Sequence, residues 1–145
     1  MKHALSLGGL SLEAELLPSY IPRGGEVRDW VVLNVAVQTP YSRCVSEKLL
    51  LSLRDLLKFR GRLSEFLRRG KFRAVALETL MPSFDMMFTL RPGERVLLEV
   101  RLSPEIRLER HMYDFDLTLP EVESFSRALE AMILSFPKEN AAGAN

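Results

Sequence analysis

Apolar and polar residues alternate in several short runs of the chain, which is the pattern of strands with one buried face. In one of these runs, Leu33, Val35 and Val37 fall on one side, and polar or small residues fall on the other. The strands predicted in this way cover residues 31–38, 84–90, 95–102 and 107–116. Between the second and third of them, Pro92 and Gly93 predict a hairpin turn, because proline fixes φ and glycine accepts a positive φ.

Two other stretches carry apolar residues at the three- and four-residue spacing of amphipathic helices. Each begins with a hydroxyl residue followed three positions later by a carboxylate, as in a capping box: Ser52 before Asp55, and Thr118 before Glu121. The predicted helices run from these caps to Gly70 and Pro137. The apolar stripes are Leu56, Phe59, Leu63, Phe66 and Leu67 in one, and Val122, Phe125, Leu129, Met132, Ile133 and Phe136 in the other.

The chain also repeats itself at an offset of about 65 residues. Residues 16–20 match 80–84, residues 31–37 match 96–102, and residues 51–67 match 117–133. The offset drifts by single residues between blocks, as expected when loops absorb short insertions. The repeat therefore predicts an internally duplicated βββα unit.

This pattern indicates an α+β fold in which an antiparallel sheet has two helices packed on one face. Two small sheets that face each other are the second arrangement. We expect a single domain over residues 1–137, with pseudo-symmetric halves at about 10–69 and 75–135. Residues 138–145 carry nothing to bury, which indicates a flexible tail.

Composition narrows the class of protein. Of 145 residues, 47% are hydrophobic and 27% are charged, as in an ordinary globular domain. The formal net charge of +1 gives no global attraction to nucleic acid or to acidic membranes. No apolar run has the length of a secretory signal or of a membrane span, and the single Cys44 cannot form an intramolecular disulfide. We therefore expect a soluble, cytoplasmic protein.

Motifs that carry catalysis are missing from the sequence, so we expect a protein that is no enzyme and has no catalytic residue, cofactor or metal. Neither Gly8-Gly9 nor Gly24-Gly25 has the setting of a phosphate loop, and both indicate turns. Cys44 could approach His111 near the pseudo-two-fold axis, but a small buried cysteine is the simpler interpretation. Asp114 and Asp116 share one side of a strand, either as paired carboxylates or, more simply, as part of a solvated face.

Charge is distributed unevenly along the chain. Residues 54–73 hold eight basic and two acidic side chains, whereas residues 105–130 hold seven acidic and three basic ones. This polarity either steers a protein partner, including a second copy of the chain in a homodimer, or reflects two solvated faces that differ. If the polarity serves binding, the candidate partner-binding residues are Glu105, Glu109, Asp114, Asp116, Glu121, Glu123, Arg68 and Arg69.

The order of elements and a few local motifs give a family resemblance. The chain resembles the WapI family of bacterial immunity proteins over two stretches. The first runs from Asp29-Trp30-Val31-Val32 to Leu67. The second runs from Phe72 to Phe136 and includes Phe115-Asp116-Leu117-Thr118-Leu119 before the last helix. One place departs from the family pattern, because Met81-Pro82 stands where a Glu-Pro pair is common.

The resemblance implies a non-enzymatic protein that binds a toxin domain and blocks it. Inhibitors of nucleic-acid-cleaving toxins are expected to be acidic, and only the C-terminal half of this chain could offer an acidic face.

Two alternatives remain open at this point. One is a small-molecule-binding protein or enzyme whose site lies in the groove between the halves and contains His111, Cys44 or the Asp114/Asp116 pair. The other is a nucleic-acid binder that uses the basic surface of residues 54–73. We rank it last, because aromatic side chains do not interleave with those arginines.

Overall fold

The computed structural model describes residues 2–20, 28–69, 73–80, 83–104 and 109–143. The first half contains β1 (Lys2–Leu7), β2 (Leu10–Tyr20), β3 (Arg28–Gln38), β4 (Arg43–Ser52) and α1 (Leu53–Arg69). The second half contains β5 (Ala74–Glu78), β6 (Phe84–Arg91), β7 (Arg95–Leu102), β8 (His111–Thr118) and α2 (Leu119–Gly143). The same order of elements therefore occurs twice.

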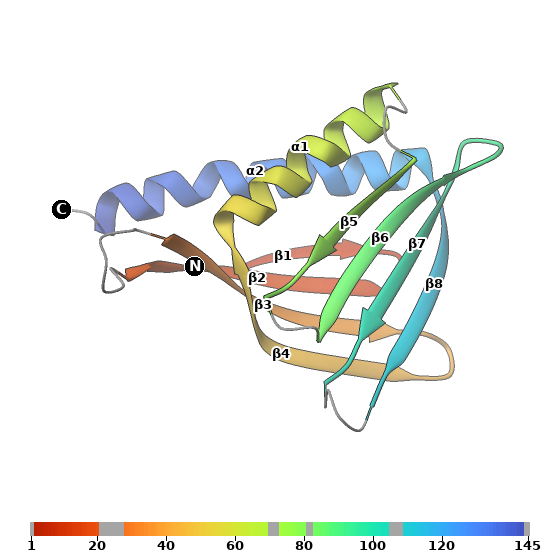
Figure 1. The fold of residues 1–145 in the computed structure, drawn as a ribbon, viewed down its shortest axis with the longest axis horizontal. Coiled ribbons are helices and arrows are strands. Elements are labelled where there is room, and N and C mark those ends of the chain that lie inside the picture. The colour runs from red at the N-terminus through yellow and green to blue at the C-terminus, as the bar shows by residue number, and fades with distance from the viewer. Residues whose placement is uncertain (1, 21–27, 70–72, 81–82, 105–108, 144–145) are drawn as a thin grey trace.

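The strands form two separate four-stranded antiparallel sheets, sheet A in the order β1-β2-β3-β4 and sheet B in the order β5-β6-β7-β8. The α+β class and the duplication are confirmed, but each unit has four strands where the sequence pattern predicted three. Among the described residues, the strands of each half pair only with one another, so two sheets replace the single continuous sheet expected first. Figure 1 shows α1 and α2 lying together along one side of both sheets.

Alternation along the strands is as predicted. Leu33, Val35 and Val37 in β3 are buried, and so are the inward residues of β7 and all those of β6 except Leu90 at its end. The predicted turn between β6 and β7 has positive φ at Gly93 and at Glu94. Gly8, with φ of 58°, likewise lies in the hairpin turn between β1 and β2.

Both helices begin at the predicted caps. The backbone N–H of Asp55 donates to Ser52 Oγ at 3.0 Å, and that of Glu121 donates to Thr118 Oγ1 at 3.4 Å. The predicted end of the second helix is wrong, because α2 continues through Pro137 to Gly143. A proline removes one hydrogen bond from a helix, but helices can continue past it at that cost. The mobility of residues 138–145 stays a prediction.

Two of the three repeated blocks coincide with equivalent elements. Residues 31–37 and 96–102 lie in β3 and β7, and residues 51–67 and 117–133 cover the passages from β4 into α1 and from β8 into α2. The first block does not, because Tyr20 lies at the end of β2 whereas Phe84 begins β6. The strand pairing gives a different correspondence. Leu10 pairs with Val37 in sheet A and Phe84 pairs with Leu102 in sheet B, so Phe84 is equivalent to Leu10 and not to Tyr20.

The inner faces of both sheets and the apolar stripes of both helices form one hydrophobic core cluster. At its centre, the ring centroid of Phe88 in β6 lies 6.2 Å from that of Phe59 in α1 and 6.1 Å from that of Phe125 in α2. The outer faces of the sheets and the exposed sides of the helices are therefore the surfaces on which a functional site can lie.

Candidate functional site

The predicted acidic residues follow the edge strand of sheet B and the start of α2. Glu109, Asp114, Asp116, Glu121 and Glu123 are all exposed. Glu105 and the side chain of Arg69 lie outside what the structure describes. Arg68 lies at the far end of α1, where its Nη2 donates to Glu65 Oε1 at 3.0 Å, so it belongs to another surface.

Two of these carboxylates have structural partners. Arg95 forms a bidentate ion pair with Asp116, with Nε to Oδ1 at 3.1 Å and Nη2 to Oδ2 at 2.8 Å. This hydrogen-bonded guanidinium lowers the pKa of Asp116 below its ordinary value. Glu121 Oε1 accepts a hydrogen bond from Thr118 Oγ1 at 3.1 Å, so its side chain supports the cap of α2. Asp114 and Asp116 are both exposed on the outer face of β8.

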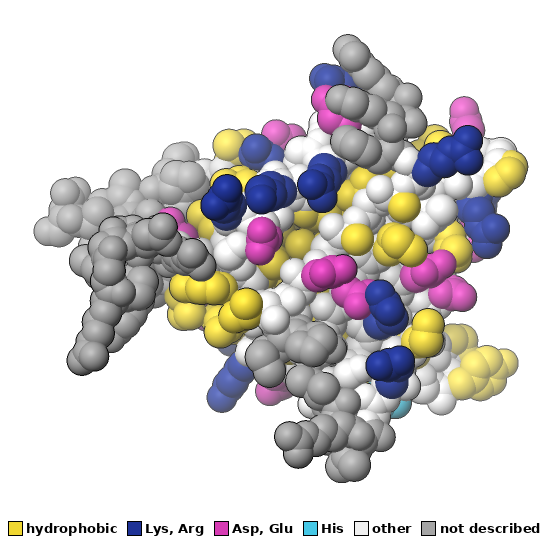
Figure 2. Space-filling model, viewed as in Figure 1, with side chains coloured by type: hydrophobic (Ala, Val, Ile, Leu, Met, Phe, Trp, Pro, Cys, Tyr) yellow, Lys and Arg dark blue, Asp and Glu magenta, His cyan; other side chains and the backbone are white. Residues whose placement is uncertain are grey.

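Sheet pairing adds acidic residues that the sequence analysis did not select. Across the strands of sheet B, Glu78 lies opposite Asp85, Asp85 opposite Arg101, and Glu99 opposite Asp114. Arg101 Nε donates to Asp85 Oδ1 at 2.9 Å. The pKa of Arg101 is raised by Asp85 first and further by the charges of Glu78 and Glu99. Figure 2 shows acidic side chains over β5 to β8, with Lys and Arg side chains among them.

The signal that could have found these residues is the alternation itself. Once β5 to β8 are paired as consecutive antiparallel neighbours, Glu78, Asp85, Glu99 and Asp114 must all point away from the core. The charge pattern along the chain is acidic only from position 105 onward, so it gave no sign of the contribution of β5, β6 and β7.

In the described part of the chain, no hydrogen bond joins Cys44 to His111. Cys44 is buried, and burial raises the pKa of its thiol; a hydrogen bond with Tyr113 opposes this rise, and the charge of Glu109 adds to it. His111 stacks on Tyr113, with ring centroids 6.4 Å apart, and its Nε2 lies 3.2 Å from Glu109 Oε2. Tyr113 thus stands next to both residues, and a protonated buried thiol is a poor nucleophile.

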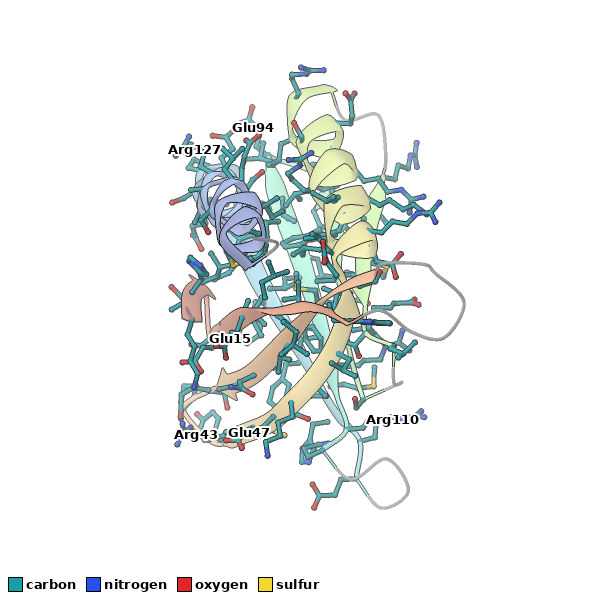
Figure 3. All side chains as sticks on the ribbon, turned by 90° about the vertical axis from the view of Figure 1, so that its left-hand side faces the viewer. Glu15, Arg43, Glu47, Glu94, Arg110 and Arg127 are labelled. Atoms are coloured by element: carbon teal, nitrogen blue, oxygen red, sulfur yellow. The ribbon has the colours of Figure 1, made fainter. Side chains whose placement is uncertain are left out.

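A hollow of about 370 Å³ lies on the outer face of sheet A. Small side chains form its floor and two carboxylates, Glu13 and Glu47, lie beside them. Its lining includes none of His111, Cys44, Asp114 and Asp116, so it is not the groove that the small-molecule alternative expected. Figure 3 shows Glu47 and Arg43 on β4, on the side of sheet A away from the helices.

The basic surface of residues 54–73 is centred on α1. Arg54, Lys58 and Arg62 recur every four residues and are exposed, so they form one row along the helix. The described part of this row carries no exposed aromatic residue on a strand platform, and the nucleic-acid alternative stays a prediction.

Metal and membrane sites were also considered. Among the described residues, no group of three or more His, Cys, Asp or Glu side chains is arranged to hold a metal ion. Neither of the helices, in their described parts, is long and apolar enough to cross a membrane.

Comparison with solved structures finds similar chains of low identity. The plant transcriptional regulator PBF-2 is matched with a TM-score of 0.49 and 10% identity, over 98% of this chain and 86% of that chain. WHY3 from Arabidopsis thaliana is matched with a TM-score of 0.47 and 10% identity, over 99% of this chain and 96% of that chain. A guideRNA-binding protein complex bound to a gRNA is matched with a TM-score of 0.47 and 15% identity, over 88% and 93%. Their functions are not transferred to this chain.

Comparison of the sequence with known proteins and with family models gives a family match. A search of the curated proteins finds no match. The model of the immunity protein WapI-like family matches residues 9–137, which include both helical caps, both amphipathic stripes and every strand from β2 to β8. The chain therefore belongs to the immunity protein WapI-like family.

Proposed function

We propose that this protein is a non-catalytic immunity protein that binds a toxin domain and blocks it. The observation that carries the proposal is the family match over residues 9–137, because it covers nearly the whole described chain. The burial of Cys44 gives further support, since the most reactive side-chain type in the chain is held in its protonated form.

The exposed acidic residues are our proposed contact region. Glu109, Asp114 and Asp116 come from one edge of sheet B, and Glu121 and Glu123 continue from it on the first turns of α2. Carboxylates outnumber cations in this region, although Arg95 pairs with Asp116, and such a predominantly acidic surface accelerates encounter with a basic partner and orients it. Arg68 and Arg69 stand on α1, beyond this region, and we leave them out of the proposed contact.

The test combines capture with a growth assay. The tagged chain is expressed in its native host, and the captured complex is identified by intact-complex mass spectrometry. We then express the captured domain in a test strain, alone and together with this chain. We expect the domain alone to arrest growth and co-expression to restore growth.

Two results would contradict the proposal. One is a captured protein that is harmless when expressed alone, and the other is a chain that elutes without any protein partner. The same chromatography reports whether the chain forms a homodimer, and cell fractionation reports whether it is cytoplasmic; both of these stay predictions.

A further inference from the structure

The outer face of sheet B is a four-stranded surface without a helix over it. Its outward positions are exposed or half-buried, whereas the inward positions of β5, β6 and β7 are mostly buried and those of β8 are mostly half-buried. Figure 1 shows both helices on the other side of this sheet, and Figure 2 shows the face itself. We call it the open face, and define it by Glu78, Asp85, Met87, Glu99, Arg101, Met112 and Asp114.

Apolar side chains occupy part of the open face. Met87 and Leu97 are half-buried on neighbouring strands, and Met112 on the edge strand β8 is 67% exposed. An exposed methionine on a sheet edge costs free energy in water and gives adaptable contacts to a partner. The face therefore offers apolar contact area as well as charge.

The charges on the open face are arranged at a cost to the free protein. Glu78 lies opposite Asp85, and Glu99 lies opposite Asp114. Like charges directly opposite each other on neighbouring strands destabilise a sheet. Arg101 offsets the first pair through its 2.9 Å bond to Asp85. Among the described residues, no direct ion pair joins a cation to Glu99 or Asp114, and the charge of Arg101 acts on Glu99 only from a greater distance.

Sheet A gives a useful contrast within the same molecule. Its outward Glu13 accepts a hydrogen bond from Asn34 Nδ2 at 3.1 Å and lies 3.5 Å from Lys2 Nζ. That carboxylate is satisfied within the chain. Within the described part of the chain, Glu99 and Asp114 have no such direct partner, although the two strands that carry them are fully in register.

We propose that the open face is the surface that binds the toxin domain, and that a basic side chain of the toxin lies between Glu99 and Asp114. This inference rests on the proposed function and identifies its site. An arginine or lysine in that position would relieve the repulsion between the two carboxylates. Charge complementarity thus selects a basic toxin surface, and Met87 and Met112 add apolar contact beside it.

If the inference is right, removing both charges should stabilise the free protein and weaken its binding to the toxin domain. Removing a pair with a merely structural role would not weaken binding. The test variant is Glu99→Gln with Asp114→Asn, which removes both charges and keeps the side-chain shapes. We expect the melting temperature of the free protein to rise by about 1–4 °C, because cross-strand repulsion is lost. We expect the dissociation constant for the captured toxin domain to rise about 10- to 100-fold, because a charge-assisted contact is lost.

The matched control is Glu47→Gln with Glu130→Gln, which removes the same net charge from exposed positions on β4 and α2. Its affinity for the toxin domain should stay within about twofold of that of the unaltered chain, because surface charges far from a contact are screened by salt. The probe in every titration is the toxin domain recovered from the captured complex, and binding is measured by isothermal titration calorimetry.

The outcomes separate this inference from the proposed function. If the unaltered chain binds no toxin domain, the proposed function fails and this inference fails with it. If the unaltered chain binds but the double variant binds equally well, the function stands and the open face is not the site. A chain that dimerises through this face, and becomes monomeric in the double variant, would show that a second copy is the occupant and would likewise overturn the inference.

Discussion

At the scale of single residues, two close neighbours leave no room for a side chain at Gly9. The backbone N–H of Gln38 donates to the Gly9 carbonyl at 2.8 Å, and the Phe115 ring of sheet B lies 2.9 Å from where a Cβ would stand. That Cβ would also collide with the Gln38 carbonyl oxygen. Because the Gln38 backbone belongs to a paired strand, it cannot move aside without cost, so the site needs glycine for space.

The corresponding prediction uses two glycine-to-alanine changes. Gly9→Ala should lower the free energy of unfolding by about 1–3 kcal/mol through overpacking. Gly61→Ala, in α1, has nothing within 4 Å of the added methyl and should raise it by up to about 1 kcal/mol, because alanine favours the helix. Urea unfolding followed by circular dichroism measures both. If both changes altered the free energy of unfolding equally, the space around Gly9 would not be as tight as described.

At the scale of elements, the passage from strand to capped helix is the feature that sequence and structure share most closely. The predicted caps and apolar stripes occur in both α1 and α2, because hydroxyl caps and helical spacing are local signals.

We expect Ser52→Ala to lower the free energy of unfolding by about 1 kcal/mol, since the N–H of Asp55 loses its acceptor. Ser64→Ala is the control, because Ser64 is exposed within the same helix and caps nothing; its effect on thermal unfolding should be small or stabilising.

Features that depend on non-local contacts were harder to predict. The short strands β1 and β5 were missed, β2 and β4 were implied only by the repeat, and the split into two sheets follows from pairings between strands rather than from any single run of residues. The same limit applies to the site. Asp114 was selected from the charge pattern, but its neighbour Glu99 lies 15 residues earlier and is brought opposite it only by the register of β7 and β8.

At the scale of the whole molecule, the two halves meet in one core. Phe88 belongs to the second half, yet its ring contacts Phe59 of the first half as well as Phe125 of its own half. The single tryptophan, Trp30, lies on β3 in the first half and reports on sheet A. If the core is shared, weakening it from sheet B must also weaken sheet A.

We therefore expect Phe88→Ala to lower the free energy of unfolding by about 3–5 kcal/mol, as for a large ring removed from a packed core. The fluorescence of Trp30 and the far-ultraviolet circular dichroism should shift together to the same new midpoint, as in two-state unfolding. Leu134→Ala is the control, because Leu134 is 63% exposed on α2 and its loss should shift neither midpoint appreciably. A Trp30 transition that keeps its original midpoint while the circular dichroism signal moves would mean that the halves unfold independently. In that case the duplicated units would be two domains, and the open face of sheet B would belong to a unit that does not depend on sheet A.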